Sequence, residues 1–131
     1  MNTVKLITTG LVLSTTAFLI GCTPQCITAN YVPFKATPPQ EIGARFNSHV
    51  KISDVGGMIV DGYMHGRVLL TNETDESQPV RYHFVWTSSD GLPQGENTPW
   101  TPVQIGPRFS QVVQSVAPNT EAVNYHIEVC Q

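Results

Sequence analysis

Four histidines are the residues that could most readily bind a metal ion, because imidazole is the commonest protein ligand for zinc and copper. They are His49, His65, His83 and His126. No His-x-His or Cys-x-x-Cys pair brings two ligands together in the sequence. His83 and His126 fall on the polar sides of two predicted strands, so they meet only if those strands are neighbours. We therefore expect ordinary surface histidines and no metal or other cofactor, with His83 and His126 as the one pair that could form a metal site.

The sequence also lacks the patterns that are typical of a catalytic site. A nucleophilic serine is often set in a Gly-x-Ser-x-Gly turn, and the chain contains none. The serines and the aspartate of residues 88–90 fit the residue preferences of a tight turn. The acidic side chains that glycoside cleavage would need cluster instead in one polar loop, residues 72–79. We therefore expect a protein that is not an enzyme.

Cys22 follows a sequence typical of lipid attachment. One positive charge, Lys5, precedes a mostly apolar stretch over residues 6–20, which is short for a membrane span and typical of a signal peptide. The stretch ends in Leu-Ile-Gly before Cys22, which resembles the bacterial lipobox, where cleavage leaves the cysteine as the lipid-carrying first residue. In the lipoproteins that this resembles, aspartate at the next position favours retention in the inner membrane, so Thr23 indicates an outer-membrane anchor with the domain facing the periplasm.

Cys26 and Cys130 remain as an even pair in a compartment that oxidises thiols. A disulfide between them would close a loop of about 100 residues, for which the chain-entropy model gives about 4.7 kcal/mol. The alternative is two unpaired thiols near the ends of the mature chain, where order is poorest.

The charge of the mature chain argues against nucleic acid as a partner. The full chain carries −3, from 7 basic and 10 acidic residues, and Lys5 is the only charged residue among residues 1–21. Removing those residues leaves 7 − 1 = 6 basic residues against 10 acidic ones, a charge of −4. The rest of the chain has the usual size of one domain.

Three segments are expected along the chain. Residues 1–21 form the signal peptide, residues 22–43 a lipidated N-terminus and a flexible tether, and residues 44–131 the folded domain. Four prolines in the tether disfavour helix and interior strand. An alternative for part of it is an edge segment packed on the domain through Tyr31, Val32 and Phe34.

Alternating apolar residues predict an all-β domain. The expected strands cover residues 46–52, 58–60, 63–71, 80–87, 100–105, 108–116 and 123–129, with a break at residues 55–57. No segment has convincing helical periodicity. About seven short strands between turns predict an antiparallel immunoglobulin-like β-sandwich, and an open barrel is the alternative.

Two groups of aromatic residues could bind a partner. Tyr82, Phe84 and Trp86 share one face of a strand, where they form either a ligand platform or, as we expect, part of the core. Leu92 and Trp100 lie in a proline-rich irregular stretch, and loops of this kind often carry binding residues. We take Leu92 and Trp100 as the possible interaction surface, with Trp100 as a cap of the sandwich as the alternative.

The stretch from Val68 to Val129 is similar to the YcfL-like family of small proteobacterial lipoproteins. The residues that carry the resemblance are Leu69-Leu70-Thr71-Asn72, Tyr82-x-Phe84-x-Trp86, Asp90-Gly91, Trp100, Ser115-Val116-Ala117-Pro118 and Ala122-Val123. Their order and spacing are more specific than any single motif. The resemblance implies a β-sandwich in the cell envelope and brings no catalytic residues.

These observations favour an outer-membrane-anchored lipoprotein that serves as a binding or accessory module for an envelope protein assembly, such as secretion or cell-wall machinery. Edge strands of a sandwich could bind such a partner by strand addition. The alternative is a periplasmic lipoprotein that binds a small molecule or a metal ion.

Overall fold

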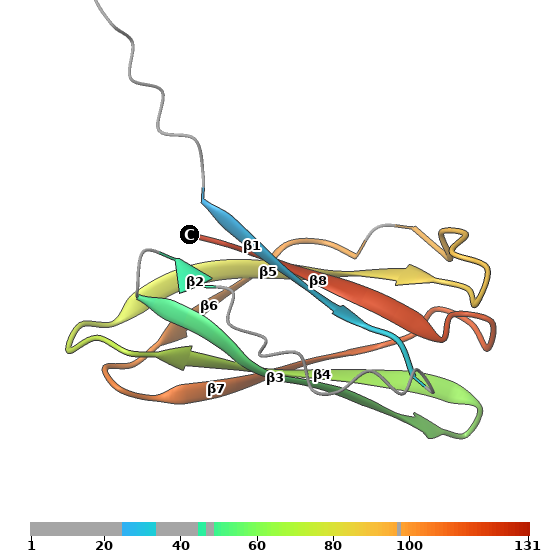
Figure 1. The fold of residues 1–131 in the computed structure, drawn as a ribbon, viewed down its shortest axis with the longest axis horizontal. Coiled ribbons are helices and arrows are strands. Elements are labelled where there is room, and N and C mark those ends of the chain that lie inside the picture. The colour runs from blue at the N-terminus through green and yellow to red at the C-terminus, as the bar shows by residue number, and fades with distance from the viewer. Residues whose placement is uncertain (1–24, 34–44, 47–48, 97) are drawn as a thin grey trace, which may run out of the picture.

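Two antiparallel sheets pack face to face in the computed structural model, which describes residues 25–33, 45–46, 49–96 and 98–131 (Figure 1). The first sheet has the strand order β1 (Cys26–Tyr31), β8 (Asn124–Cys130), β5 (Gln78–Thr87), β6 (Thr101–Ile105). The second has the order β2 (Arg45–Phe46), β3 (Val50–Val60), β4 (Tyr63–Asn72), β7 (Ser110–Val116). The expected antiparallel β-sandwich is confirmed.

The expected signal peptide, Cys22 and most of the expected tether lie outside the described residues. Among the residues that are described, no helix has the length and apolar character needed to cross a membrane.

Part of the segment assigned to the tether forms an edge strand. β1 pairs along its whole length with β8, from Cys26 opposite Cys130 to Tyr31 opposite Tyr125. The expected disulfide joins the first of these pairs. Ala29 is buried in the core, so apolar burial adds to the hydrogen bonds that hold the strand. The folded domain therefore includes residues 26–31, and its start lies well before residue 44.

β3 runs without interruption through residues 55–57, where the sequence pattern indicated a break. A Cβ atom on Gly57 would lie 2.9 Å from the Sδ atom of Met64. Opposite in β4, a Cβ atom on Gly66 would lie 2.9 Å from the ring of Tyr125. These glycines make room for core side chains inside a continuous strand, which is why the expected break was wrong.

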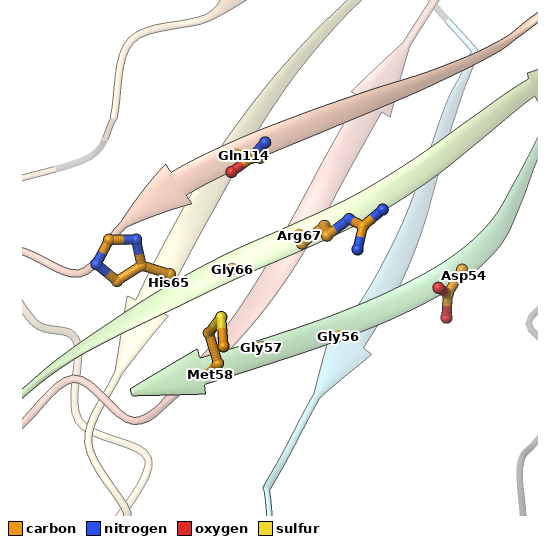
Figure 2. A pocket seen from close by; sticks show the side chains of 8 residues that line it. All are labelled: Asp54, Gly56, Gly57, Met58, His65, Gly66, Arg67 and Gln114. Atoms are coloured by element: carbon orange, nitrogen blue, oxygen red, sulfur yellow. The ribbon is translucent and has the colours of Figure 1, made fainter. Parts of the chain in front are cut away.

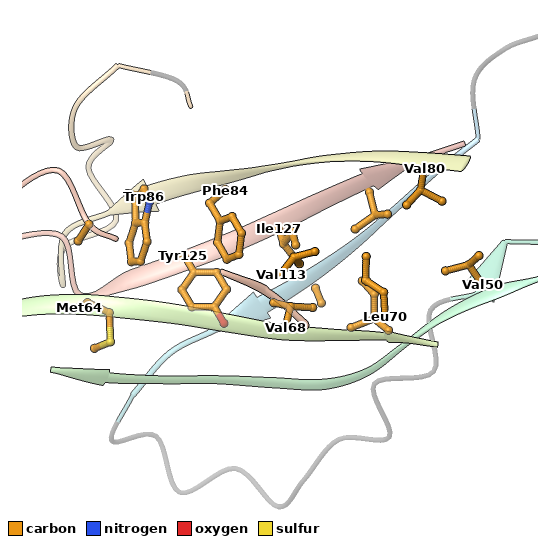
Figure 3. Packing of buried hydrophobic residues seen from close by; sticks show 14 of the residues in the cluster. Val50, Met64, Val68, Leu70, Val80, Phe84, Trp86, Val113, Tyr125 and Ile127 are labelled. Atoms are coloured by element: carbon orange, nitrogen blue, oxygen red, sulfur yellow. The ribbon is translucent and has the colours of Figure 1, made fainter. Parts of the chain in front are cut away.

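The core fills the space between the two sheets (Figure 3). Phe84 and Trp86 on β5 are buried, which confirms them as core residues, and Tyr82 packs against the core while partly buried. The Tyr125 ring on β8 lies 5.1 Å from the Phe84 ring and 5.2 Å from the Trp86 ring, measured between centroids. Aliphatic side chains complete the cluster, among them Val50, Ile52, Val68, Leu70, Val80, Val113 and Ile127.

Asn72, at the end of β4, ties together the turns at one end of the sandwich. Its Nδ2 atom lies 2.7 Å from the carbonyl oxygen of Glu76, 3.0 Å from that of Ile105 and 2.9 Å from that of Gly106. Its Oδ1 atom accepts hydrogen bonds from the backbone N–H and the hydroxyl of Thr74. One buried amide thus holds the acidic loop against the β6–β7 turn.

Replacing the buried indole tests the core assignment. Trp86→Ala should lower the free energy of unfolding by about 3 to 5 kcal/mol, because it leaves a large cavity. Trp86→Phe should cost clearly less, because the indole Nε1 is buried with no hydrogen-bond partner among the described residues and phenylalanine gives up only packing. Urea unfolding of both variants measures this. A nearly neutral alanine variant would contradict the buried position of the ring.

Candidate functional site

The β3–β4 hairpin ends at one end of the sandwich (Figure 1). Its apolar side chains there are exposed to solvent. The chain reverses at Asp61 and Gly62, whose φ angles of 53° and 84° fit the type I′ turn that Asp-Gly favours. Around this turn, Met58 is 64% exposed, and Ile59, Val60 and Tyr63 are exposed as well. Such side chains bury little surface within their own chain.

A neighbouring strand extends this apolar surface. Met58 on β3 is paired with His65 on β4, which is paired with Val116 on β7, and Val116 is 53% exposed. We define the tip patch as Met58, Ile59, Val60, Tyr63 and Val116. Exposed apolar side chains gathered at one end of a domain often mark an interaction site.

A hollow of about 300 Å³ adjoins the tip patch on the outer face of the second sheet (Figure 2). Backbone of Gly56, Gly57 and Gly66 lines it, together with the side chains of Asp54, Met58, His65, Arg67 and Gln114. A Cβ atom on Gly56 would meet nothing within 4 Å. Close packing therefore does not require glycine at position 56, and a larger side chain there would fill the hollow. One carboxylate and one guanidinium on its rim leave the hollow without a strong net charge.

Tyr125 supports the floor of the hollow from inside the core. Its hydroxyl oxygen lies 2.6 Å from the carbonyl oxygen of Gly56 and 3.2 Å from that of Arg67, so the hydroxyl donates to the backbone of β3 and β4. Burial raises the pKa of Tyr125, which keeps the hydroxyl protonated. The floor is thereby held to the opposite sheet, and the hollow is preformed.

A second polar cluster lies on the outer face of the first sheet. The His83 ring stacks on Trp100 with 3.9 Å between centroids. Its Nε2 atom lies 2.7 Å from a carboxylate oxygen of Glu128, and its Nδ1 atom lies 3.2 Å from the carbonyl oxygen of Thr98. Oxygen atoms of Glu128 and Thr98 thus hold the His83 ring at both of its nitrogens.

Glu128 also brings the two candidate metal ligands near each other. β5 and β8 are neighbours, and His126 Nε2 lies 3.5 Å from the other carboxylate oxygen of Glu128. The hydrogen bond from His83 holds the pKa of Glu128 below its usual range. Within the described part of the chain, no three histidine, cysteine or acidic side chains are arranged to hold a metal ion.

The loop with Leu92 and Trp100 is fixed to β5. The Ser88 N–H donates to the Leu92 carbonyl oxygen at 2.9 Å, and the Thr98 hydroxyl is hydrogen-bonded to both backbone groups of Phe84. The loop thus lies along the part of β5 that β6 does not reach. Trp100 stacks on His83 over the face of the sheet and is still 40% exposed, and Leu92 is 62% exposed.

A family model described as a protein of unknown function, DUF1425, matches residues 42–131, more than half of the chain. The chain belongs to the DUF1425 family. β3–β8 lie within the matched range, and β1 lies outside it. No curated protein matches the sequence.

Two solved structures share the fold. A DUF1425 family member from Shewanella sp. pv-4 superposes with a TM-score of 0.59 at 22% identity, covering 63% of this chain and 77% of that one. Campylobacter jejuni cj0090 superposes with a TM-score of 0.53 at 16% identity, covering 72% of this chain and 90% of that one. Identities this low establish the fold alone.

Sequence reasoning missed both the tip patch and the hollow of this DUF1425 domain. The signal for the patch was an Asp-Gly turn, Asp61–Gly62, with large apolar residues directly on both sides, where hairpin ends are usually polar. The signal for the hollow was the Gly56–Gly57 pair, which was taken as a break in the strand.

Glu128→Gln tests the ion pair with His83. The pKa of Glu128 is lower in the folded protein than in the unfolded chain, where it is near 4.5. Ionised Glu128 therefore stabilises the fold at pH values above 4.5, and this stabilisation is lost as the pH falls through the pKa of the folded protein. The variant should be less stable than the parent near neutral pH, by less than about 1 kcal/mol, because the Glu128 side chain is 37% exposed and solvent screens the pair.

The difference between the two proteins should shrink as the pH drops below about 4.5, and urea unfolding across this range measures it. Glu121→Gln, an exposed carboxylate before β8, is the matched control. If the stability of Glu128→Gln and that of Glu121→Gln changed with pH in the same way, the ion pair between Glu128 and His83 would be contradicted.

Proposed function

We propose that this DUF1425 protein is an outer-membrane-anchored lipoprotein, held by lipid on Cys22, whose sandwich is a non-enzymatic binding module for a protein of an envelope assembly such as secretion or cell-wall machinery. The signal-peptide pattern and the lipobox-like Leu-Ile-Gly before Cys22 support the anchor. The similarity to YcfL-like lipoproteins supports a place in the envelope. The tip patch supports the binding role.

The position of the tip patch favours a protein partner over the membrane itself. The Tyr31 hydroxyl donates to the carbonyl oxygen of Gly57 at 3.3 Å, so the end of β1 lies beside the hairpin. Cys26 starts β1 five residues earlier, about 17 Å away at roughly 3.3 Å per residue. Figure 1 shows the start of β1 well away from the β3–β4 turn. An anchor attached just before Cys26 therefore leaves the patch pointing away from the lipid.

The chemistry of this surface suits an apolar, weakly charged partner. Its exposed side chains are aliphatic or aromatic. The hollow beside them carries Asp54 and Arg67, whose charges offset each other. An inserted apolar side chain could fill the hollow above Gly56, which is the usual form of an interface hot spot.

A small neutral molecule is the second candidate ligand, and the volume of the hollow favours it. About 300 Å³ is the lower end of the range for small-molecule sites. The hollow lies on the open face of a sheet, however, where a compact ligand would keep much of its surface in water. A protein that covers the tip patch and the hollow together buries more apolar area, and we therefore favour it.

Photocrosslinking in intact cells tests the binding role. A photoreactive residue at Met58 should capture one dominant protein, and the same residue at Leu92, equally exposed but in the other loop, should not. Gly56→Val, which fills the hollow without a core clash, should reduce capture from position 58 by about tenfold, the equivalent of 1.4 kcal/mol.

Capture from Leu92 alone would move the interface to the 88–100 loop and contradict the tip patch. Failure of both positions to capture a protein would contradict a protein partner at either surface and favour the small-ligand alternative.

A further inference from the structure

β7 is an edge strand whose outward backbone groups can be identified from its pairing. It pairs with β4, and it is the last strand in the order of the second sheet. At one end of this ladder the Asn72 N–H donates to the Phe109 carbonyl oxygen, and at the other the Ala117 N–H donates to the Met64 carbonyl oxygen. Because bonding alternates along an antiparallel strand, odd-numbered residues 109–117 face β4. The N–H and C=O groups of Ser110, Val112, Gln114 and Val116 therefore point outward.

These outward groups are open to a further strand. Among the described residues, no backbone group is hydrogen-bonded to them. One side chain is, since Gln111 Nε2 donates to the Val112 carbonyl oxygen at 3.1 Å. That amide is exposed and can turn away at little cost.

β7 also lacks the features that usually block an exposed edge. Its sequence, SQVVQSV, contains no charge and no proline, and its register with β4 has no bulge. β6, the edge of the first sheet on the same side, contains Pro102. The nearest preceding charge, Arg108, is paired with Asp75 at 2.9 Å. Nothing in the strand itself opposes pairing with another strand.

We propose that β7 pairs antiparallel with β7 of a second copy, joining the two second sheets into one continuous sheet. A two-fold axis through Val113 sets Ser110 opposite Val116 and Val112 opposite Gln114. All four outward residues then face outward residues of the other copy, which allows up to about eight backbone hydrogen bonds. Self-pairing sets each side chain near others of the same strand, where like charges would repel, so the uncharged sequence suits this partner.

This interface shares two residues with the surface proposed for docking, because Val116 belongs to the tip patch and Gln114 lines the hollow. Met58 and Val60 lie on β3, two strands away from the β7–β7 contact, and Tyr63 lies on β4, one strand away. The tests below measure only self-association of the purified chain, so they separate a failure of this pairing from a failure of the proposed function.

Cysteine crosslinking of the purified full-length chain in detergent tests the register. A mixture of Val112→Cys and Gln114→Cys should form disulfide-linked dimers under mild oxidation, because these positions face each other in the proposed pair. Each variant alone should crosslink weakly, since identical positions are diagonal neighbours about 7 to 8 Å apart. Strong crosslinking of Val112→Cys alone, or none in the mixture, would overturn the proposed pairing.

Sedimentation equilibrium of proline variants tests the backbone contact. Gln114→Pro removes an outward N–H that β4 does not use, and it should weaken the dimer by at least about tenfold while leaving the melting temperature of the monomer nearly unchanged. Gln114→Ala keeps the N–H and should dimerise like the parent. A parent chain that is monomeric at every accessible concentration, or a proline variant that dimerises like the alanine variant, would overturn the proposal.

Discussion

The disulfide between Cys26 and Cys130 is the constraint on which the arrangement of the molecule depends. It joins residues 104 positions apart and fixes β1 in register along β8. By the chain-entropy model, closing so long a loop stabilises the fold by about 4.7 kcal/mol, comparable to a large part of the stability of a small domain. Because Cys22 precedes Cys26 by only four residues, the same bond sets which end of the sandwich would face an anchor.

The core in turn shapes the surface of the second sheet. Tyr125 crosses from β8 to the backbone of β3 and β4, and its ring occupies the space where a side chain on Gly66 would lie. The ring therefore fits only because position 66 carries no side chain. Gly56, whose missing side chain the packing does not require, leaves the surface bare beside the tip patch and so contributes to the hollow. The core thus holds the floor of the hollow, whereas the missing side chain at position 56 leaves the hollow open.

Much of the fold could be predicted from local patterns. Alternation predicted β5, with Phe84 and Trp86 in the core, and counting cysteines predicted the disulfide. An edge segment at Tyr31 was only the alternative to a flexible tether, because the prolines around it outweighed a six-residue strand whose pairing is entirely with the far end of the chain. Strand order is a property of such long-range pairing, and the sequence could not supply it.

The candidate sites depended still more on tertiary structure. His83 and Trp100 were singled out separately, and their stacking follows from the 88–100 loop folding back onto β5. The tip patch consists of residues that read as ordinary strand residues, and only the packing shows that Met58 and Val116 stay uncovered. Exposure of an apolar residue is set by what the rest of the chain leaves uncovered, which periodicity does not report.

Membrane fractionation of the parent and Cys22→Ala is the most direct test of the central claim, that the sandwich is held by lipid at one end and binds at the other. The parent should sediment with outer membranes, and the variant, without its acyl chains, should be lost from the outer-membrane fraction. Cys22→Ala leaves Cys26 and Cys130 free to form their disulfide, so a correctly folded soluble domain is expected. A variant that still sediments with outer membranes as the parent does would contradict the anchor and, with it, the outward direction of the tip patch.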